Sequence, residues 1–270
     1  MPSEEVLNDL KLCQERVHKW GEQNRVSFDA GKEEFAVLHH QDGEGRDFRL
    51  LGPVFDAKLL MHSAVQKVVS KAKPKTQALL KLRRYYSTSD LVYQFKAHVL
   101  CVLKSCTAAV YHAASSVLRP LDRVLDSFLE ELKLSREEAF LRYNLAPLTF
   151  RRDVAMLGLL HKCTLGLAHP RLQELFPPAP LRPEPRYSTR ASAARHSRQL
   201  LERCKGHFLE TTRRSVFGLV KVYNYLSQDT VDLDSVKSFQ AALTAKARKA
   251  CTTGDTGWAN LYSPRLVRQG

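Results

Sequence analysis

Apolar residues at helical spacing dominate the chain. Near its start, Ser3 is followed by two acidic residues, an arrangement typical of the first turn of a helix. Behind it, apolar side chains recur at helical intervals, at Val6, Leu10, Cys13 and Val17. This pattern predicts a helix over residues 3–22.

The same periodicity predicts many more helices from residue 57 onward. In chain order they cover 57–72, 75–86, 89–118, 120–132, 135–146, 148–166, 211–225 and 235–250. Pro74 and Pro120 are expected to separate neighbouring helices, because proline lacks a backbone donor and its ring disrupts a helix interior. Ser135 with Glu138 three residues later forms a capping-box arrangement, which indicates a helix start.

A short extended region lies between the first helix and the others. Residues 26–28 can form a brief extended piece, and residues 35–38 and 48–55 flank the stretch HQDGEG. Its Asp-Gly pair favours a chain reversal, so we expect one β-hairpin with a longer loop. The sequence therefore predicts an α+β fold that is predominantly α-helical, with a small hairpin near the N-terminus.

A proline-rich segment divides the helical part. Five prolines fall within residues 177–186, and polar residues follow, which favours an extended or mobile connector. We expect residues 178–205 to be poorly ordered or only partly helical, and residues 252–270 to form an irregular tail. The predicted domains are 1–56, 57–176, a connector at 177–205, and 206–270.

The charge of the chain indicates a polyanionic partner. Lys and Arg number 42 against 28 Asp and Glu, giving a net charge of +14 and a pI near 9.6. Between Asp56 and Asp122 the only acidic residue is Asp90, against eleven basic ones. A second basic excess covers residues 182–221, with ten basic and three acidic residues. The alternative is a solvated helix face; phosphate contact is the favoured interpretation for the first cluster, and a solvated face is favoured for the second.

Other sequence features bound the chemistry. The six cysteines form no disulfide framework, which favours a reducing, intracellular location, nuclear or cytoplasmic. Apolar runs are interrupted by charges too early for a transmembrane helix, so no membrane partner is expected. The spacing of His98, Cys101 and Cys106 could suggest zinc, but buried packing is the favoured interpretation. His161 and His169 are expected on helix faces rather than as catalytic bases.

Catalytic motifs are missing from the sequence. A two-metal nucleotidyl transfer site needs closely placed carboxylates, and no Asp-Asp pair occurs. The stretch DAGK at residues 29–32 has the wrong glycine spacing for a phosphate-binding P-loop. The residues alone therefore predict no metal site and no cofactor.

Three stretches together resemble one family. Trp20 near a helix end, Asn24, Lys32 and then LLGPVFDAKLLM at residues 50–61 follow in the order seen at the end of the palm in reverse transcriptases of non-LTR retrotransposons. Residues 78–113 resemble the helical thumb and connection region that follows the palm. Residues 213–243 resemble the tail of such proteins, although Ser227 stands where proline is usual.

This resemblance implies a fragment of an RNA-directed DNA polymerase from a transposable element. The family's catalytic aspartates precede the Trp-bearing helix, so the chain is expected to be truncated downstream of them and inactive alone, with Mg²⁺ needed only in an intact polymerase. Lys32 would be the palm lysine near an incoming triphosphate. A primer-grip-like hairpin would include three residues, Leu51, Gly52 and Phe55.

The resemblance also implies a partner, an RNA/DNA hybrid or another nucleic acid. Its phosphates would be contacted without sequence reading by seven basic residues, Lys67, Lys71, Lys73, Lys75, Lys81, Arg83 and Arg84. Tyr85 and Tyr86 could stack on bases, but burial in the core is the favoured expectation. The alternative function is a basic helical module that binds an acidic protein.

Overall fold

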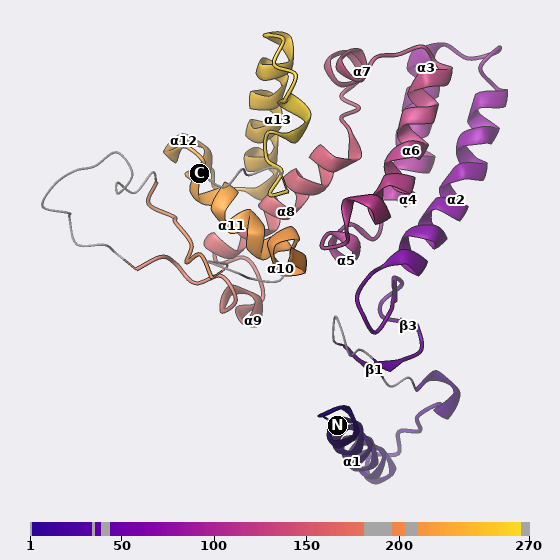
Figure 1. Ribbon diagram of the computed structural model, residues 1–270, viewed down its shortest axis with the longest axis vertical. Coiled ribbons are helices and arrows are strands. Elements are labelled where there is room, and N and C mark those ends of the chain that lie inside the picture. Colours follow the sequence, from indigo (N-terminus) through magenta and orange to yellow (C-terminus); the bar gives the residue numbers. More distant parts are fainter. Residues whose placement is uncertain (1, 34–35, 39–43, 181–195, 204–209, 266–270) are drawn as a thin grey trace, which may run out of the picture. The chain divides into compact units, whose positions relative to one another are not determined.

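Helices make up most of the described chain, and the strands lie within the first sixty residues (Figure 1). The computed structural model describes residues 2–33, 36–38, 44–180, 196–203 and 210–265. The predicted class, a predominantly helical α+β fold, is confirmed. The chain divides into two units, Met1–Lys67 and Val68–Gly270, which are described separately below.

The first unit begins with helix α1 (Pro2–Gln23), which confirms the predicted helix. Its inward face differs from the predicted one, because Val6, Cys13 and Val17 are exposed. Instead the half-buried residues are Leu7, Leu10, Gln14 and His18. Polar contacts explain this choice: Glu33 accepts a hydrogen bond from Gln14 and contacts His18 Nε2 at 2.7 Å. The ring of Phe28 stacks on His18 at 5.4 Å.

After the turn η1 (Ala30–Lys32), the extended region forms two short antiparallel ladders, so the prediction of a single hairpin is wrong. Strand β1 (Ala36–Val37) pairs with β2 (Glu44–Gly45), and β3 (Phe48–Arg49) pairs with β4 (Val54–Phe55). The second reversal arises at Leu51 and Gly52, whose φ angles of 50° and 111° match the two positive-φ positions of a type I′ turn. The predicted Asp-Gly turn lies outside the described residues.

A single helix, α2 (His62–Lys81), is found where two helices over 57–72 and 75–86 were predicted. It starts five residues late because the Asp56 carboxylate accepts hydrogen bonds from the Leu60 and Met61 backbone N–H groups, at 2.8 and 2.6 Å. These contacts hold the preceding residues in a turn. The predicted break at Pro74 is wrong, since α2 continues through it; Pro74 is exposed, so its ring displaces no packed neighbour.

The predicted long helix over 89–118 is divided into shorter pieces. They are α3 (Thr88–Phe95), the π-helical turn η2 (Lys96–Leu100), α4 (Cys101–Lys104) and α5 (Thr107–Val110). The Ser105 and Thr107 hydroxyls donate to backbone carbonyls at 2.7 and 2.9 Å, which competes with helix continuation at this point. Helix α6 (Ser115–Glu131) then contains Pro120, so the predicted break there is also wrong.

Of the remaining helices, α7, α8 and α13 lie close to prediction, whereas the short elements α9, α12 and η3 were not predicted. Helix α7 (Arg136–Tyr143) begins at the predicted cap, where the Ser135 hydroxyl accepts from Glu138 N–H at 3.0 Å. The others are α8 (Leu148–Thr164), α9 (Pro170–Gln173), α10 (Glu210–Arg214), α11 (Val216–Asn224), α12 (Gln228–Val231), α13 (Val236–Thr252) and η3 (Trp258–Asn260). The predicted helix over 211–225 breaks between α10 and α11, where a Cβ on Gly218 would lie 1.8 Å from the Arg213 carbonyl oxygen.

Helix α8 is central to the core of the second unit, where it packs against α11 and α13 (Figure 1). Gly158 lies against α13, and a Cβ there would lie 2.3 Å from the end of the Gln240 side chain, which would have to move. The tail is less irregular than predicted. Trp258 in η3 is buried and stacks on Phe140 of α7, with ring centroids 4.7 Å apart.

The predicted connector is described only at its two ends, residues 177–180 and 196–203, and most of it lies outside the described residues. Neither end is helical: residues 196–198 form a turn, and Pro178 forms a β-bridge with Leu200. The side-chain amide of Asn224 on α11 also pairs with Leu200, accepting from its N–H at 2.9 Å and donating to its carbonyl at 2.8 Å. The described ends of the connector are therefore anchored to the core.

Candidate nucleic-acid interface

Helix α2 has a buried side and a basic side. The buried side consists of Ala64, Val65, Val69, Ala72 and Thr76. At about 100° per residue, Lys67, Lys71 and Lys81 fall within an arc of about 80° that contains none of these buried residues, whereas Lys75 lies between the directions of Ala64 and Ala72. Amphipathic spacing therefore directs Lys67, Lys71 and Lys81 away from the core, and Lys75 is exposed as well.

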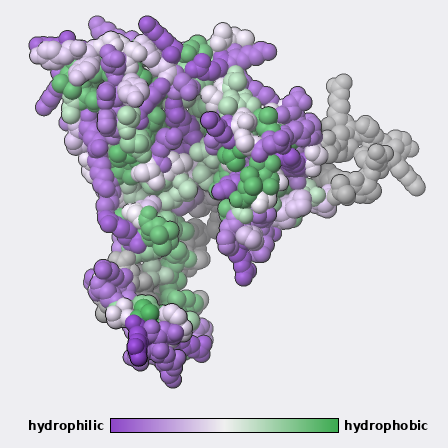
Figure 2. Space-filling model, turned by 180° about the vertical axis from the view of Figure 1, so that it is seen from behind, coloured by the Kyte–Doolittle hydropathy of each residue, from purple (hydrophilic) through white to green (hydrophobic). Residues whose placement is uncertain are grey.

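All seven predicted basic residues lie on α2 or in the turn after it. We call them the α2 basic surface: Lys67, Lys71, Lys73, Lys75, Lys81, Arg83 and Arg84. Lys67 is half-buried and the other six are exposed. Figure 2 shows the molecule from behind, with the α2 edge at the left, and hydrophilic residues predominate along that edge.

Most of this surface lacks neutralising partners. Arg83 forms an ion pair with Glu131 at the end of α6; both side chains are about half exposed, so the pair is screened by water. Within the described ranges, no carboxylate lies within 4 Å of five basic side chains: Lys71, Lys73, Lys75, Lys81 and Arg84. Their positive charge is therefore available to an external anion.

Two tyrosines lie next to this surface. Tyr85 and Tyr86 are 82% and 50% exposed, so the expectation of burial in the core is wrong. Both belong to the turn between α2 and the cap of α3 at Ser87, which places them outside the packed helices. Exposed aromatic rings beside basic residues can stack on nucleic-acid bases.

Lys32 lies in the first unit, at the end of η1. Its ammonium pairs with Asp29 at 3.1 Å, and its side chain is 83% exposed. Among the residues that the structure describes, no group of three His, Cys, Asp or Glu side chains could hold a metal ion. In the part of the chain that the structure describes, Asp29 is thus a partner of the predicted palm lysine but belongs to no cluster of metal ligands.

The predicted primer-grip-like residues form the β3–β4 turn and its second strand. Leu51 is 97% exposed at the tip, beside Gly52, an unusual place for a large apolar side chain. Phe55 is half-buried and stacks on Phe48 across the ladder at 5.8 Å. The hairpin is thus stabilised by one aromatic pair and presents an apolar tip to solvent.

The possible zinc ligands do not converge. Cys106 is buried, as the packing interpretation expects, whereas His98 and Cys101 are exposed, so that interpretation is wrong for these two. The Cys101 thiol donates to the Ala97 carbonyl at 3.0 Å. The expected burial rested on the usual preference of cysteine for the interior and on the apolar helix around it, and neither fixes which side of that helix faces the core.

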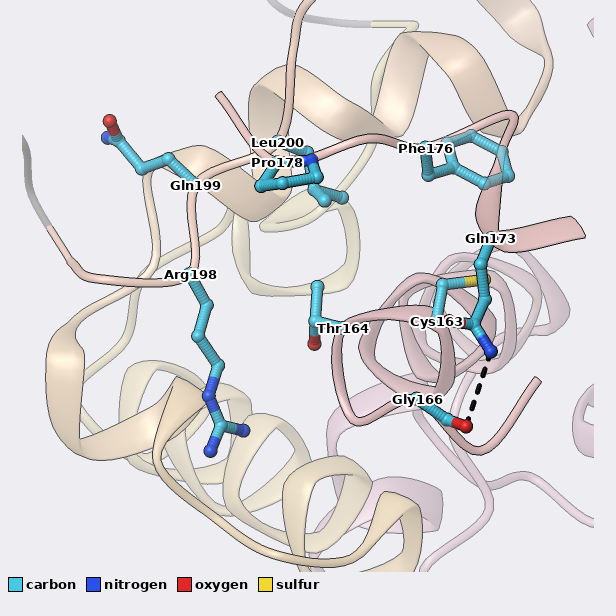
Figure 3. A pocket seen from close by; sticks show the side chains of 9 residues that line it. All are labelled: Cys163, Thr164, Gly166, Gln173, Phe176, Pro178, Arg198, Gln199 and Leu200. Carbon is cyan, nitrogen blue, oxygen red and sulfur yellow. Dashed lines mark hydrogen bonds between the residues drawn. The ribbon is translucent and has the colours of Figure 1, made fainter. Parts of the chain in front are cut away.

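A small pocket of about 280 Å³ opens beside the end of α8 (Figure 3). It is lined by Cys163, Thr164, Gly166, Gln173, Phe176, Pro178, Arg198, Gln199 and Leu200. Figure 3 shows the Gln173 amide bonded to the Gly166 carbonyl, at 3.2 Å. Burial raises the pKa of the Cys163 thiol, which disfavours the nucleophilic thiolate. The Cys163 thiol is therefore not activated for nucleophilic attack.

His161 is structural rather than catalytic. It is fully buried, and its Nε2 lies 2.8 Å from the Leu233 carbonyl, which can only accept, so Nε2 carries the proton. Its Nδ1 then accepts from the Tyr223 hydroxyl at 3.1 Å. Burial lowers the pKa of His161, which keeps the ring neutral.

Comparisons with protein-family models, with curated proteins and with solved structures found no match for this chain. None of the helices in the described part is both long and apolar enough to cross a membrane. The function is therefore inferred from the residues themselves.

Of the interactions at the α2 basic surface, sequence reasoning missed the pair between Arg83 and Glu131, because 48 residues separate the partners.

Proposed function

We propose that this chain binds nucleic acid through the α2 basic surface, as the C-terminal part of a reverse transcriptase of the non-LTR retrotransposon type, without polymerase activity of its own. The observation that carries the proposal is the set of five exposed basic side chains on and after α2 that have no carboxylate partner among the described residues. Cations in this state attract phosphates and release counterions on binding.

The length of the surface suits a nucleic-acid backbone. From Lys71 to Lys81 the helix rises about 15 Å, at about 1.5 Å per residue. With phosphates about 3.4 Å apart along the axis of a strand, this length faces four or five of them. Such contacts supply affinity without reading sequence. Tyr85 and Tyr86 would add stacking at one end of the surface.

The proposal assigns no chemistry to Lys32 or to the hairpin around Leu51 in this chain alone. In the family that the sequence resembles, a lysine and a hairpin at these positions serve a site built on metal-bound aspartates. Two-metal transfer requires those carboxylates to hold its divalent ions. Nucleotide incorporation by this chain in the presence of Mg²⁺ would contradict the proposal.

Charge reversal of the α2 basic surface tests the proposal. The variant Lys71→Glu, Lys73→Glu, Lys75→Glu, Lys81→Glu is expected to bind an RNA/DNA hybrid at least tenfold more weakly than the unaltered chain. Loss of four phosphate contacts should also reduce the slope of log affinity against log salt by about three units. Fluorescence anisotropy of a labelled hybrid, titrated at several salt concentrations, measures both quantities.

A matched control variant makes the same change in net charge at positions outside α2. Lys11, Lys19, Lys237 and Lys249 are all exposed, and their reversal to Glu changes the charge by the same amount. If this control weakens binding equally, the interaction is one of overall charge rather than of α2. Competition with an acidic peptide distinguishes nucleic-acid binding from the alternative function, binding of an acidic protein. A peptide that displaces the hybrid completely at equal charge concentration would favour a protein partner.

A further inference from the structure

A second basic site lies between α8 and α13, in the second unit. A groove of about 470 Å³ opens there, and its lining includes Lys104, Asn144, Arg151, Gln240, Thr244 and Arg248. These residues come from α4, α8, α13 and the segment that joins α7 to α8. Three of them are cationic, and none is acidic.

The C-terminal end of α7 organises these cations. Arg248 donates to the Phe140 carbonyl at 3.0 Å, and Arg151 donates to the Ala146 carbonyl at 3.1 Å and to that of Asn144. Lys96, which does not line the groove, donates to the Tyr143 carbonyl. Carbonyls at a helix end carry partial negative charge, so they attract cations.

These contacts leave donors unused. A guanidinium has five N–H donors, and the contacts above occupy a minority of them. Lys104 makes no side-chain hydrogen bond to any described residue, and no carboxylate in the described chain lies within 4 Å of the four cations. Neutral hydrogen-bonding groups line the same groove, on Asn144, Gln240 and Thr244.

The cations also repel one another. The pKa of Lys96 is lowered by burial and by the charges of Arg151 and Arg248, and that of Lys104 by burial and by Arg151. Four positive groups therefore converge on one side of the fold, and no carboxylate of the described residues lies within 4 Å of them. Partial carbonyl charges offset this repulsion only in part, and a bound anion would relieve it.

We propose that the groove between α8 and α13 binds a small phosphate-bearing ligand of nucleotide size, with Lys104, Arg151 and Arg248 contacting its phosphates. Its volume falls in the usual range for small-molecule sites. The guanidinium groups suit phosphate because they can donate two parallel hydrogen bonds. The site uses other helices than the α2 basic surface and does not depend on the function proposed for that surface.

Trp258 provides a local reporter for binding. It stacks on Phe140, and the Arg248 guanidinium lies 5.4 Å from the centre of the same Phe140 ring. The only other tryptophan is Trp20, in the first unit, and Trp20→Phe leaves Trp258 as the single emitter. In this background, inorganic pyrophosphate and a nucleoside triphosphate are each expected to change Trp258 emission saturably, whereas the free nucleoside is not.

Lys104→Glu is the decisive variant, because the Lys104 side chain is exposed and makes no hydrogen bond or ion pair with any described residue. We expect it to weaken pyrophosphate binding at least tenfold. Lys249→Glu, an exposed charge reversal next to Arg248, should weaken it less than twofold. The variant with four reversed lysines on α2 should also bind pyrophosphate as the unaltered chain does, which separates the two sites.

Three results would overturn the inference. The first is no saturable response to either probe up to millimolar concentration. The second is an equal loss of affinity in the Lys104→Glu and Lys249→Glu variants. The third is a Lys104-dependent response to a single-stranded oligonucleotide but to neither small probe, since the groove would then belong to a polymer-binding surface.

Discussion

Asn224 is the residue that fixes the returning end of the connector. Its amide pairs with both backbone groups of Leu200, as a neighbouring strand would, and Asn224 is 8% exposed. The orientation of the amide follows from these partners, since only its oxygen can accept from an N–H, and its NH2 group also donates to the Glu202 carboxylate at 3.3 Å. The sequence offers no signal for this contact, because asparagine near a helix end is usually a turn residue and the partner lies 24 positions away.

Replacement Asn224→Asp tests this role. A carboxylate still accepts from Leu200 N–H but cannot donate to the Leu200 carbonyl, and it adds a buried negative charge. We expect the free energy of unfolding to fall by about 1–3 kcal/mol, as for other buried groups left unsatisfied. Urea denaturation measures this change, with the exposed Asn260→Asp as control. Equal stability of the two variants would mean that the connector is not anchored through Asn224.

At the scale of elements, periodicity predicts where helices lie better than where they end. Helices α8 and α13 appear nearly as predicted because their apolar faces are continuous. The errors arise from single residues: α2 passes through Pro74 and α6 through Pro120, where the proline rule predicts breaks. Burial of the apolar face of a helix can offset the free-energy cost of one proline. The local sequence does not show how much of that face is buried.

Pro74→Ala is therefore expected to stabilise α2. Proline is about 3 kcal/mol less favourable than alanine within a helix, and Pro74 is exposed, so its removal costs little packing. Hydrogen exchange should show stronger protection of α2 amides, by about 1–3 kcal/mol of local opening energy. Gln77→Ala, at an exposed position of the same helix, should change protection by less than about 0.5 kcal/mol. Unchanged protection in Pro74→Ala would indicate that α2 is interrupted there in solution.

At the scale of the whole molecule, one core joins segments from both sides of the proline-rich region. It includes Phe140 and Leu157 before that region, and Leu219, Leu243 and Trp258 after it. The α2 basic surface could be predicted from the sequence because it lies on one helix and the turn that follows. The groove between α8 and α13 could not, since its cations are close only after four distant segments pack together.

The buried ionisable groups of this core respond to pH in opposite directions. Asp153 accepts from the Tyr111 hydroxyl at 2.6 Å and lies 3.9 Å from Arg265, yet burial raises its pKa to about 6. Folding therefore favours its protonated form, and the stability it contributes is lost as pH rises through 6. Burial lowers the pKa values of His161 and His196. The stability that these neutral rings contribute is therefore lost as the pH falls below the pKa of an ordinary histidine.

A comparison with Asp153→Asn isolates the carboxylate, because both histidines are present in each protein. The asparagine can still accept from Tyr111 but does not titrate. With a folded pKa of about 6 and an ordinary value of 3.8, the unaltered chain should gain about 1 kcal/mol relative to the variant between pH 7 and pH 5. Urea denaturation at both pH values gives this difference, and Asp229→Asn, at an exposed site, controls for the lost charge. A difference that shrinks on acidification would show that the Arg265 charge, rather than burial, sets the protonation of Asp153.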